Sequence, residues 1–244
     1  MRVEIAHLLV LRDGFPAVDG VSLTLDGGVW TGVVGANGSG KTSLLRALAG
    51  RIDAAAGSIV VDGENRVDDR AWRAQAFGFA PDPASLPQTL TGRELFSILV
   101  SETPGRGEAD PLFPLRRALG FDAFLDRRIG TLSAGMRQRL AIFCAFLQRS
   151  RLVILDEPFN WLDPVCAFDT REALKELVAR EELSLVTALH EMATLTSHCD
   201  RGLLLSGGKA GLELGPAELR AGARDFAAFE AGIIGLLRSP SGAA

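Results

Sequence analysis

The residues that offer the clearest chemistry lie in the segment GANGSGKT, residues 35–42, which satisfies the pattern G-x-x-x-x-G-K-[ST]. An apolar run typical of a buried strand precedes it, and the helix-like run SLLRALAG follows. Glycines let the backbone curl so that its N–H groups, with the following helix N-terminus, point at phosphate oxygens. We therefore predict a phosphate-binding loop, whose nucleotide contacts are expected from Gly35, Asn37, Gly38, Ser39, Gly40, Lys41, Thr42 and Ser43.

A second segment, RLVILDEP at residues 151–158, offers the carboxylates that such a loop needs. Its apolar run suits a buried strand that delivers Asp156 at its carboxyl end, where ligands collect in α/β sheets. Asp156 is expected to hold Mg²⁺ together with the hydroxyl of Thr42, while Lys41 supplies positive charge to the β- and γ-phosphates. Glu157 faces differently along the pleat and is predicted to polarise the attacking water as a general base.

Composition limits the classes of protein that the chain can belong to. The 244 residues are 47% hydrophobic and 23% charged, as in an ordinary globular protein with ample core. A net charge of -4 gives no electrostatic footprint for nucleic acid, so no nucleic-acid partner is expected. No apolar run approaches the roughly 20 residues that a membrane span requires, so we expect no direct membrane insertion and a cytoplasmic chain.

The alternation of apolar runs and helix start signals predicts an α/β fold. Strands are expected at residues 21–25, 29–35, 58–61, 77–80, 151–155, 183–189 and 202–206. Thr91 with Glu94 makes a capping box, Ser133 is expected to cap a helix that runs through about residue 149, and Asp163 followed by Pro164 opens another. We predict one domain over residues 1–215, with a core at about 1–81 and 151–215, a helical subdomain at about 82–150, and a helical extension at 216–244.

The order of five segments along the chain resembles that of the ATP-binding subunits of ABC transporters. These are GANGSGKT, LSAGMRQR at residues 132–139, LVILDEP, NWLDP and ALH, and the resemblance covers about residues 3–210. It implies a P-loop NTPase core with an antiparallel β sub-region and an inserted helical subdomain. It also implies that ATP and Mg²⁺ are bound, and that two such domains close head to tail around two nucleotides.

The resemblance assigns further site residues in this chain. Ser133 and Gly135, in the signature segment LSAGMRQR, are expected to cap the ATP held by a second ABC ATPase chain, either a copy of this one or a different protein. The position of the segment at a helix N-terminus suits a γ-phosphate. Asp163 matches the D-loop aspartate that touches the opposite site. His190, which follows an apolar strand, matches the switch histidine and is expected to act in catalysis.

Several residues depart from the family pattern. Asp82 occupies the place of the Q-loop glutamine and is expected to approach Mg²⁺ or its water. No tyrosine is present to stack on adenine, and the register places Arg12 in that slot, with Phe15 as the alternative. The signature carries alanine and methionine at positions 134 and 136, and Trp161 adds bulk to the D-loop.

The expected function is that of an ATP-hydrolysing subunit that powers transport through a separate transmembrane permease subunit. The chain would then lie peripherally on the cytoplasmic face of the membrane. Phe96, Leu99 and Phe113 are apolar candidates for contact with the permease, although core packing is the alternative for each. Asp82 and the short chain favour an exporter of the ABC-2 kind. Two alternatives stay open: a soluble ABC ATPase of an assembly machine, and a regulatory subunit with low turnover.

Overall fold

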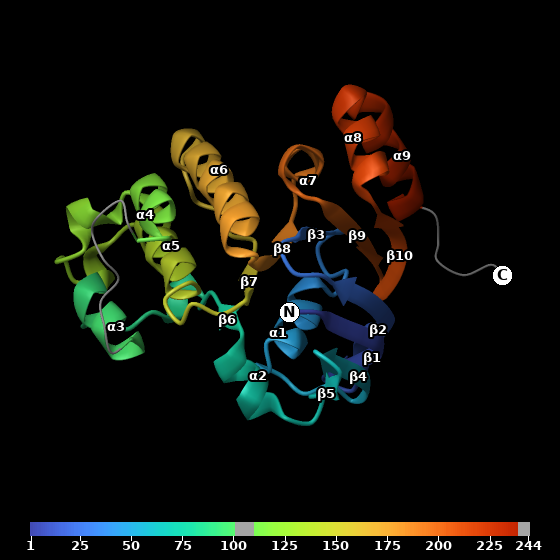
Figure 1. Cartoon of the computed structure of the whole chain (residues 1–244), viewed down its shortest axis with the longest axis horizontal. Coiled ribbons are helices and arrows are strands. Elements are labelled where there is room, and N and C mark those ends of the chain that lie inside the picture. Colours follow the sequence, from blue (N-terminus) through green and yellow to red (C-terminus); the bar gives the residue numbers. More distant parts are fainter. Residues whose placement is uncertain (101–109, 239–244) are drawn as a thin grey trace.

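A parallel β-sheet forms the centre of the computed structural model, which describes residues 1–100 and 110–238 (Figure 1). Within these residues the strand order is β10-β9-β3-β8-β7-β6, and only β10 runs antiparallel to its neighbour. The strands are β3 (Trp30–Val34), β6 (Gly78–Phe79), β7 (Leu152–Asp156), β8 (Ser184–Leu189), β9 (Arg201–Ser206) and β10 (Lys209–Leu214). The α/β fold class is thus confirmed, and β10 is a strand that the sequence did not reveal.

A second, antiparallel sheet covers helix α1 (Lys41–Leu48) from the other side. Its order is β2-β1-β4-β5, formed by β1 (Val3–Arg12), β2 (Phe15–Leu25), β4 (Ala56–Val61) and β5 (Glu64–Asn65). Apolar side chains of α1, such as Leu44 and Leu45, pack in one buried cluster with Val10 of the antiparallel sheet and Ile154 of the parallel sheet. The phosphate-binding loop is therefore anchored by a helix that is enclosed between two sheets.

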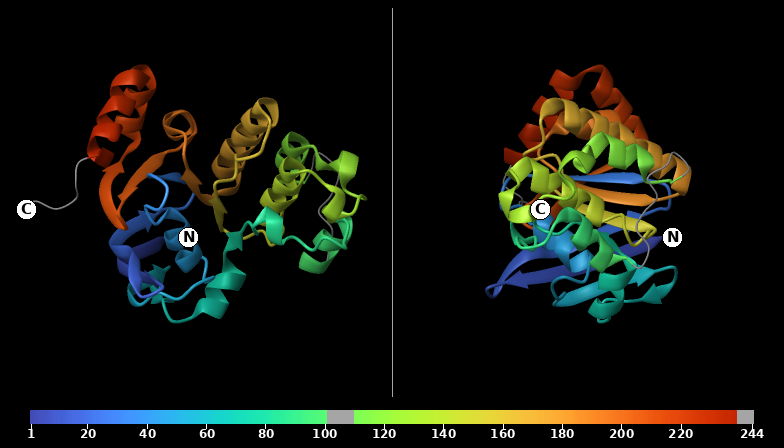
Figure 2. Two further views of the ribbon diagram at one scale, coloured as in Figure 1. Left: turned by 180° about the vertical axis from the view of Figure 1, so that it is seen from behind. Right: turned by 90° about the vertical axis from the view of Figure 1, so that its left-hand side faces the viewer.

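The remaining helices lie around the parallel sheet (Figures 1 and 2). Helices α3, α4 and α5 gather beyond the β6 edge, α6 and α7 cover a face of the sheet, and α8 and α9 lie at the β10 end. Their bounds are α2 (Arg70–Ala76), α3 (Gly92–Leu99), α4 (Phe113–Leu119), α5 (Ala134–Cys144), α6 (Pro164–Glu181), α7 (Met192–His198), α8 (Pro216–Arg224) and α9 (Phe226–Arg238). Residues 239–244 of the predicted extension lie outside the described residues.

The predicted helix starts are confirmed, but one helix ends earlier than expected. Thr91 and Glu94 form the reciprocal capping box of α3, and Ser133 and Asp163 cap α5 and α6 through their side chains. Helix α5 ends at Cys144 instead of near residue 149. Its last turn tightens, because the next two backbone N–H groups bond to carbonyls three residues back. Arg149 then adopts a positive φ of 50° as the chain turns into β7.

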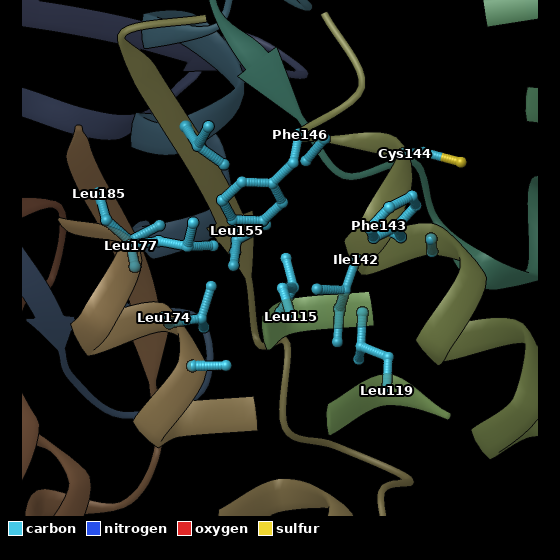
Figure 3. Packing of buried hydrophobic residues seen from close by; sticks show 14 of the residues in the cluster. Leu115, Leu119, Ile142, Phe143, Cys144, Phe146, Leu155, Leu174, Leu177 and Leu185 are labelled. Atoms are coloured by element: carbon cyan, nitrogen blue, oxygen red, sulfur yellow. The ribbon is translucent and has the colours of Figure 1, made fainter. Parts of the chain in front are cut away.

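The core beside the helical segment is built around packed aromatic rings. Phe121 and Phe143 have ring centroids 4.7 Å apart, and Phe96 lies within 5.4 Å of the first ring and 5.3 Å of the second. Figure 3 shows how this region meets the sheet: side chains of α4 and α5 lie opposite those of α6 and of strands β7 and β8, among them Leu115, Leu174, Leu177, Leu155 and Leu185. The α3–α5 region and the sheet thus share one continuous apolar core.

The aromatic cluster leads to a prediction about stability. Phe143→Ala removes a ring that is 1% exposed, and we expect a loss of about 3–5 kcal/mol in the free energy of unfolding, because a cavity remains. The matched control Phe15→Ala removes a ring that is 75% exposed and should change the free energy by less than about 0.5 kcal/mol. Denaturant unfolding followed by circular dichroism measures both, and equal losses would contradict this account of the core.

Candidate functional site

The candidate site lies where three parallel strands end at the same edge of the sheet. Val34, the last residue of β3, pairs with Leu189 at the end of β8, and Asp156 at the end of β7 pairs with Ala188. The phosphate-binding loop follows β3, the Asp156-Glu157 pair closes β7, and His190 follows β8. Residues 35–42, 156–157 and 190 are therefore brought to one edge, as ligand sites in open α/β sheets require.

The phosphate-binding loop holds its lysine side chain close to the backbone. Lys41 is 4% exposed, and its Nζ donates to the carbonyl oxygens of Gly35 at 2.8 Å and Ala36 at 3.2 Å. Burial lowers the pKa of Lys41, while the nearby carboxylates of Glu157 and Asp156 act in the opposite direction. The partners of the ammonium group are neutral carbonyl oxygens, for which a phosphate anion could exchange.

The cleft beside this loop contains most of the residues predicted to contact a nucleotide. It is lined by Ala17, Asn37, Gly38, Ser39, Gly40, Lys41, Thr42, Ser43 and Glu157. The buried hydroxyl oxygen of Ser39 has no partner among the described residues, so a phosphate oxygen would satisfy it. Gly40 has φ +101°, and its backbone lies against the carbonyl of Ala17, which leaves no room for a Cβ. The contacts of these residues with a nucleotide remain predictions.

The adenine-stacking candidates lie at some remove from the lined cleft, at the tip of the β1–β2 hairpin. Arg12 and Phe15 pair directly across this hairpin, joined by a tight turn whose two residues both have positive φ. Both side chains are exposed, and neither lines the cleft beside the phosphate-binding loop, where Ala17 is the contribution of β2. Because the two residues pair directly with each other, their positions do not favour one candidate over the other.

Thr42 and Asp156 form the pair that would hold a divalent cation. The Thr42 hydroxyl donates to Oδ1 of Asp156 at 3.2 Å, and burial raises the pKa of Asp156, with Glu157 adding to the effect. A hydroxyl and a carboxylate are oxygen ligands of the kind that Mg²⁺ prefers, so the residues fit that ion. Among the described residues, no group of three or more His, Cys, Asp or Glu side chains could hold a metal. A cation held by this pair would need further oxygen ligands from a nucleotide or from water.

Asp82 lines a cavity beside this pair, but its carboxylate is already engaged in a local hydrogen bond. It lines a cavity with Thr42, Asp156 and Glu157, and its predicted approach to Mg²⁺ or its water stays a prediction. Its Oδ1 accepts the backbone N–H of Ala84 at 2.8 Å and so caps the short 3₁₀ turn Pro83–Ser85. A direct role of Asp82 as a metal ligand would require its carboxylate to leave this cap.

Glu157 and His190 contact each other directly. The Nε2 atom of His190 lies 2.6 Å from Oε1 of Glu157, and the amide of Asn160 donates to the other carboxylate oxygen, Oε2, at 2.9 Å. Glu157 adopts a positive φ of 50°, which turns the chain sharply out of β7 at the position of the carboxylate. The residues predicted as general base and switch histidine are thus neighbours in space.

The signature helix α5 is attached to the loop that follows Glu157. Gln138, which is buried, donates through Nε2 to the carbonyl of Pro158 at 2.9 Å, and Nη2 of Arg139 lies 2.6 Å from Oδ2 of Asp163. A Cβ at Gly135 would lie 2.5 Å from the carbonyl oxygen of Trp161, so only glycine fits there. These three contacts tie α5 to residues 158–163 of its own chain.

The N-terminal end of the signature is open to solvent. Ser133 accepts the backbone N–H of Met136 at 3.2 Å and so caps its own helix. Ser133 and Ala134 are exposed, as is Trp161, which has 74% exposure and a positive φ of 68°. The structure places Ser133 outside both clefts that contain Thr42.

Three residues near the site did not stand out in the sequence. Asn160 binds Glu157, Gln138 binds Pro158, and Arg46 lines the same cavity as Thr42 and Asp156. Asn160 follows Glu157 by three residues, a spacing that a tight turn brings together, and this signal was available. Gln138 and Arg46 act through tertiary packing, for which no local signal exists.

The fold and the site define a P-loop nucleotide-binding protein of the α/β class. The sequence profile of the family described as ABC transporter matches residues 18–160, so the chain belongs to this family. It is an ATP-binding ATPase of the ABC type, the cassette of an ABC transporter. No helix in the described part of the chain is long and apolar enough to cross a membrane.

Similar proteins include ATP-binding proteins of importers. The phosphonates import ATP-binding protein PhnC of Agrobacterium fabrum is 32% identical over 226 residues, which cover 85% of this chain and 77% of that protein. The Fe(3+) ions import ATP-binding protein FbpC of Yersinia pestis is 29% identical over 227 residues, covering 89% and 63%.

Solved structures support the same fold. An ATP-binding subunit of an ABC transporter has a TM-score of 0.80 and 25% identity, with 96% of this chain and 100% of that chain covered. An ATP-binding cassette solved as a dimer with ADP and Pi has a TM-score of 0.74 and 20% identity, covering 88% and 98%. The second likeness concerns the fold alone.

The contact between Gly135 and Trp161 leads to a prediction. Gly135→Ala places a methyl group against the Trp161 carbonyl, so the free energy of unfolding should fall by about 1–3 kcal/mol. The matched control is Gly232→Ala in α9, where a Cβ meets nothing within 4 Å and the higher helix propensity of alanine should stabilise by up to about 1 kcal/mol. Thermal denaturation measures both, and a neutral Gly135→Ala would show that the Trp161 loop yields freely.

Proposed function

We propose that this chain hydrolyses ATP to power the transport of a substrate through a separate transmembrane permease subunit. The observation that carries the proposal is the convergence of Lys41, Thr42, Asp156, Glu157 and His190 at one sheet edge. The relatives described above, which are named as import ATP-binding proteins, support the transport role. The membrane passage is proposed to lie in the partner, as the ATP-binding subunits named above serve transporters.

Each residue has a proposed role in hydrolysis. The backbone of residues 35–40 and Lys41 bind the phosphates, and Thr42 with Asp156 holds Mg²⁺, which supplies charge neutralisation at the phosphate oxygens. Glu157 accepts a proton from the attacking water. The Nε2 atom of His190 already contacts Glu157, and its place at the end of β8 suits a contact with the γ-phosphate as well.

We further propose that hydrolysis takes place in a head-to-tail dimer. Ser133, Gly135 and Asp163 would contact the nucleotide of a second ABC ATPase chain, either a copy of this chain or a different one. Ser133 is exposed and lies outside the two clefts of its own chain that contain Thr42. Both observations support a contact with another molecule. An ATP-binding cassette of related fold has been solved as a dimer, and this supports the proposal.

The role of Glu157 gives a direct test. Glu157→Gln keeps the size and loses the proton acceptor, so kcat should fall by about 10²- to 10⁴-fold. Mg-ATP binding should persist, and an ATP-bound dimer should accumulate, because hydrolysis no longer releases it. Steady-state phosphate release measures kcat, a nucleotide-binding assay measures the affinity for Mg-ATP, and light scattering measures the mass of the dimer. Unchanged kcat in Glu157→Gln would exclude the base role, and absent turnover in the unmodified chain with its partner would favour the low-turnover regulatory alternative.

A groove at the β6 edge is the proposed docking place of the permease. It is lined by Arg51, Phe77, Gly78, Phe79, Pro81, Leu99, Cys144 and Gln148. Leu99 is 37% exposed there, which supports its predicted contact with the partner. Phe96 is buried in the aromatic cluster, so its expected permease contact is wrong and core packing is its function; Phe113 is half-buried and lines no part of this groove. Docking would place the chain on the cytoplasmic face of the membrane.

The groove makes a prediction about assembly. Leu99→Asp introduces a charge into an apolar contact and should abolish recovery of the membrane partner, while ATP binding persists. Leu212→Asp on β10 is the matched control, because that leucine is also 37% exposed but lies outside the groove. Affinity purification from detergent-solubilised membranes, with mass spectrometry, reads the outcome. Persistent recovery of a soluble scaffold and no polytopic protein would favour the assembly-machine alternative.

The direction of transport is a separate part of the proposal. Asp82 favoured an exporter in the sequence, but the relatives described above are import proteins, and they support uptake. Transport into or out of sealed vesicles distinguishes uptake from export. ATP is supplied to the face that carries this chain, and the side on which the substrate accumulates gives the direction. The transported substrate is not assigned by any residue of this subunit, because the substrate passes through the permease.

A further inference from the structure

The side chain of Asn160 holds the carboxylate of Glu157 from the side opposite to His190. Its Nδ2 donates to Oε2 of Glu157 at 2.9 Å, while Nε2 of His190 lies 2.6 Å from Oε1. A backbone hydrogen bond from the N–H of Asn160 to the carbonyl of Glu157, at 3.3 Å, closes the turn that brings the two side chains together. Each carboxylate oxygen therefore has one fixed partner.

The chemistry of the contact requires the amide nitrogen to face Glu157. An ionised carboxylate only accepts hydrogen bonds, and an asparagine offers its NH₂ group as donor. One donor on each oxygen fixes both the direction and the plane of the carboxylate, yet leaves lone pairs for a third donor, such as a water. A residue that fixes a general base in this way contributes to the rate without contacting the reacting atoms.

We propose that Asn160 is a positioning residue that orients Glu157 for proton abstraction, an inference that rests on the proposed function. Asn160 lines the cavity that contains Thr42 and Asp156 and also the smaller cavity that contains His190. Its amide thus lies at the boundary between the phosphate side and the histidine side of the site. The turn that carries it is tied to the signature helix through the Gln138 bond to Pro158.

A double-mutant cycle with Glu157 separates positioning from a general structural role. Asn160→Ala should lower kcat for ATP by about tenfold, because the base is no longer fixed, and leave KM within about twofold. In the Glu157→Gln background, Asn160→Ala should cause no further loss, because the group that it positions is already absent. An equal loss in both backgrounds, or an effect on KM alone, would overturn the proposal.

Asn65→Ala is the matched control for the loss of an asparagine side chain. The side-chain Oδ1 of Asn65, in strand β5, accepts the backbone N–H groups of Ile59 at 3.3 Å and Val67 at 3.2 Å. Its removal should lower the thermal stability and leave kcat unchanged. A fall in kcat that follows stability in both variants would count against positioning by Asn160.

The contact can also be read without turnover. In the nucleotide-free chain, the side-chain amide resonance of Asn160 in ¹⁵N NMR should move on Glu157→Gln, whereas that of Asn65 should stay in place. An unmoved Asn160 resonance would overturn the proposal whether or not the chain hydrolyses ATP. Conversely, a shifted resonance in a chain that hydrolyses no ATP would contradict the proposed function and leave the hydrogen bond intact.

Discussion

The alignment of the ends of β3, β8 and β7 is the constraint on which the rest of the site depends. Strand β8 lies between the other two, and its register sets Val34 opposite Leu189 and Asp156 opposite Ala188. A shift of one residue in either pairing would turn each following side chain to the other face of the sheet. The hydrogen bond from Thr42 to Asp156 and the contact of His190 with Glu157 both require this register.

The three contacts of α5 with residues 158–163 give the signature helix a second role within its own chain. The helix presents Ser133 to the outside, while Gln138 and Arg139, a little over one turn further along, bind the loop that carries Asn160. The buried glutamine thus connects the helix that carries the signature to the turn that begins at Glu157. Because the helix and the loop share side-chain hydrogen bonds as well as packing, they are expected to move as one unit.

The sequence predicted the motifs and most of the parallel strands, because these signals are local. It missed β1, because His7 has a positive φ of 48° within the strand and the pairing shifts register between Ile5 and Leu8, which breaks the alternation of buried residues. The end of α5 was also wrong, since apolar residues continue to 147 while the backbone already turns. Gln138 and Arg139 were part of a quoted motif, but their partners depend on how α5 packs against the loop after β7.

The distribution of charge in the site bears on the proposed binding of Mg²⁺ together with a nucleotide. Asp82, Asp156 and Glu157 line one cavity, with Arg46 as the cationic side chain among its lining residues, while Lys41 lines the neighbouring cleft. Burial already disfavours the ionised form of Asp156, as its raised pKa shows, and a triphosphate would add negative charge beside it. A divalent cation held by Asp156 would offset both effects, so the proposed binding of Mg²⁺ and that of the nucleotide would favour each other.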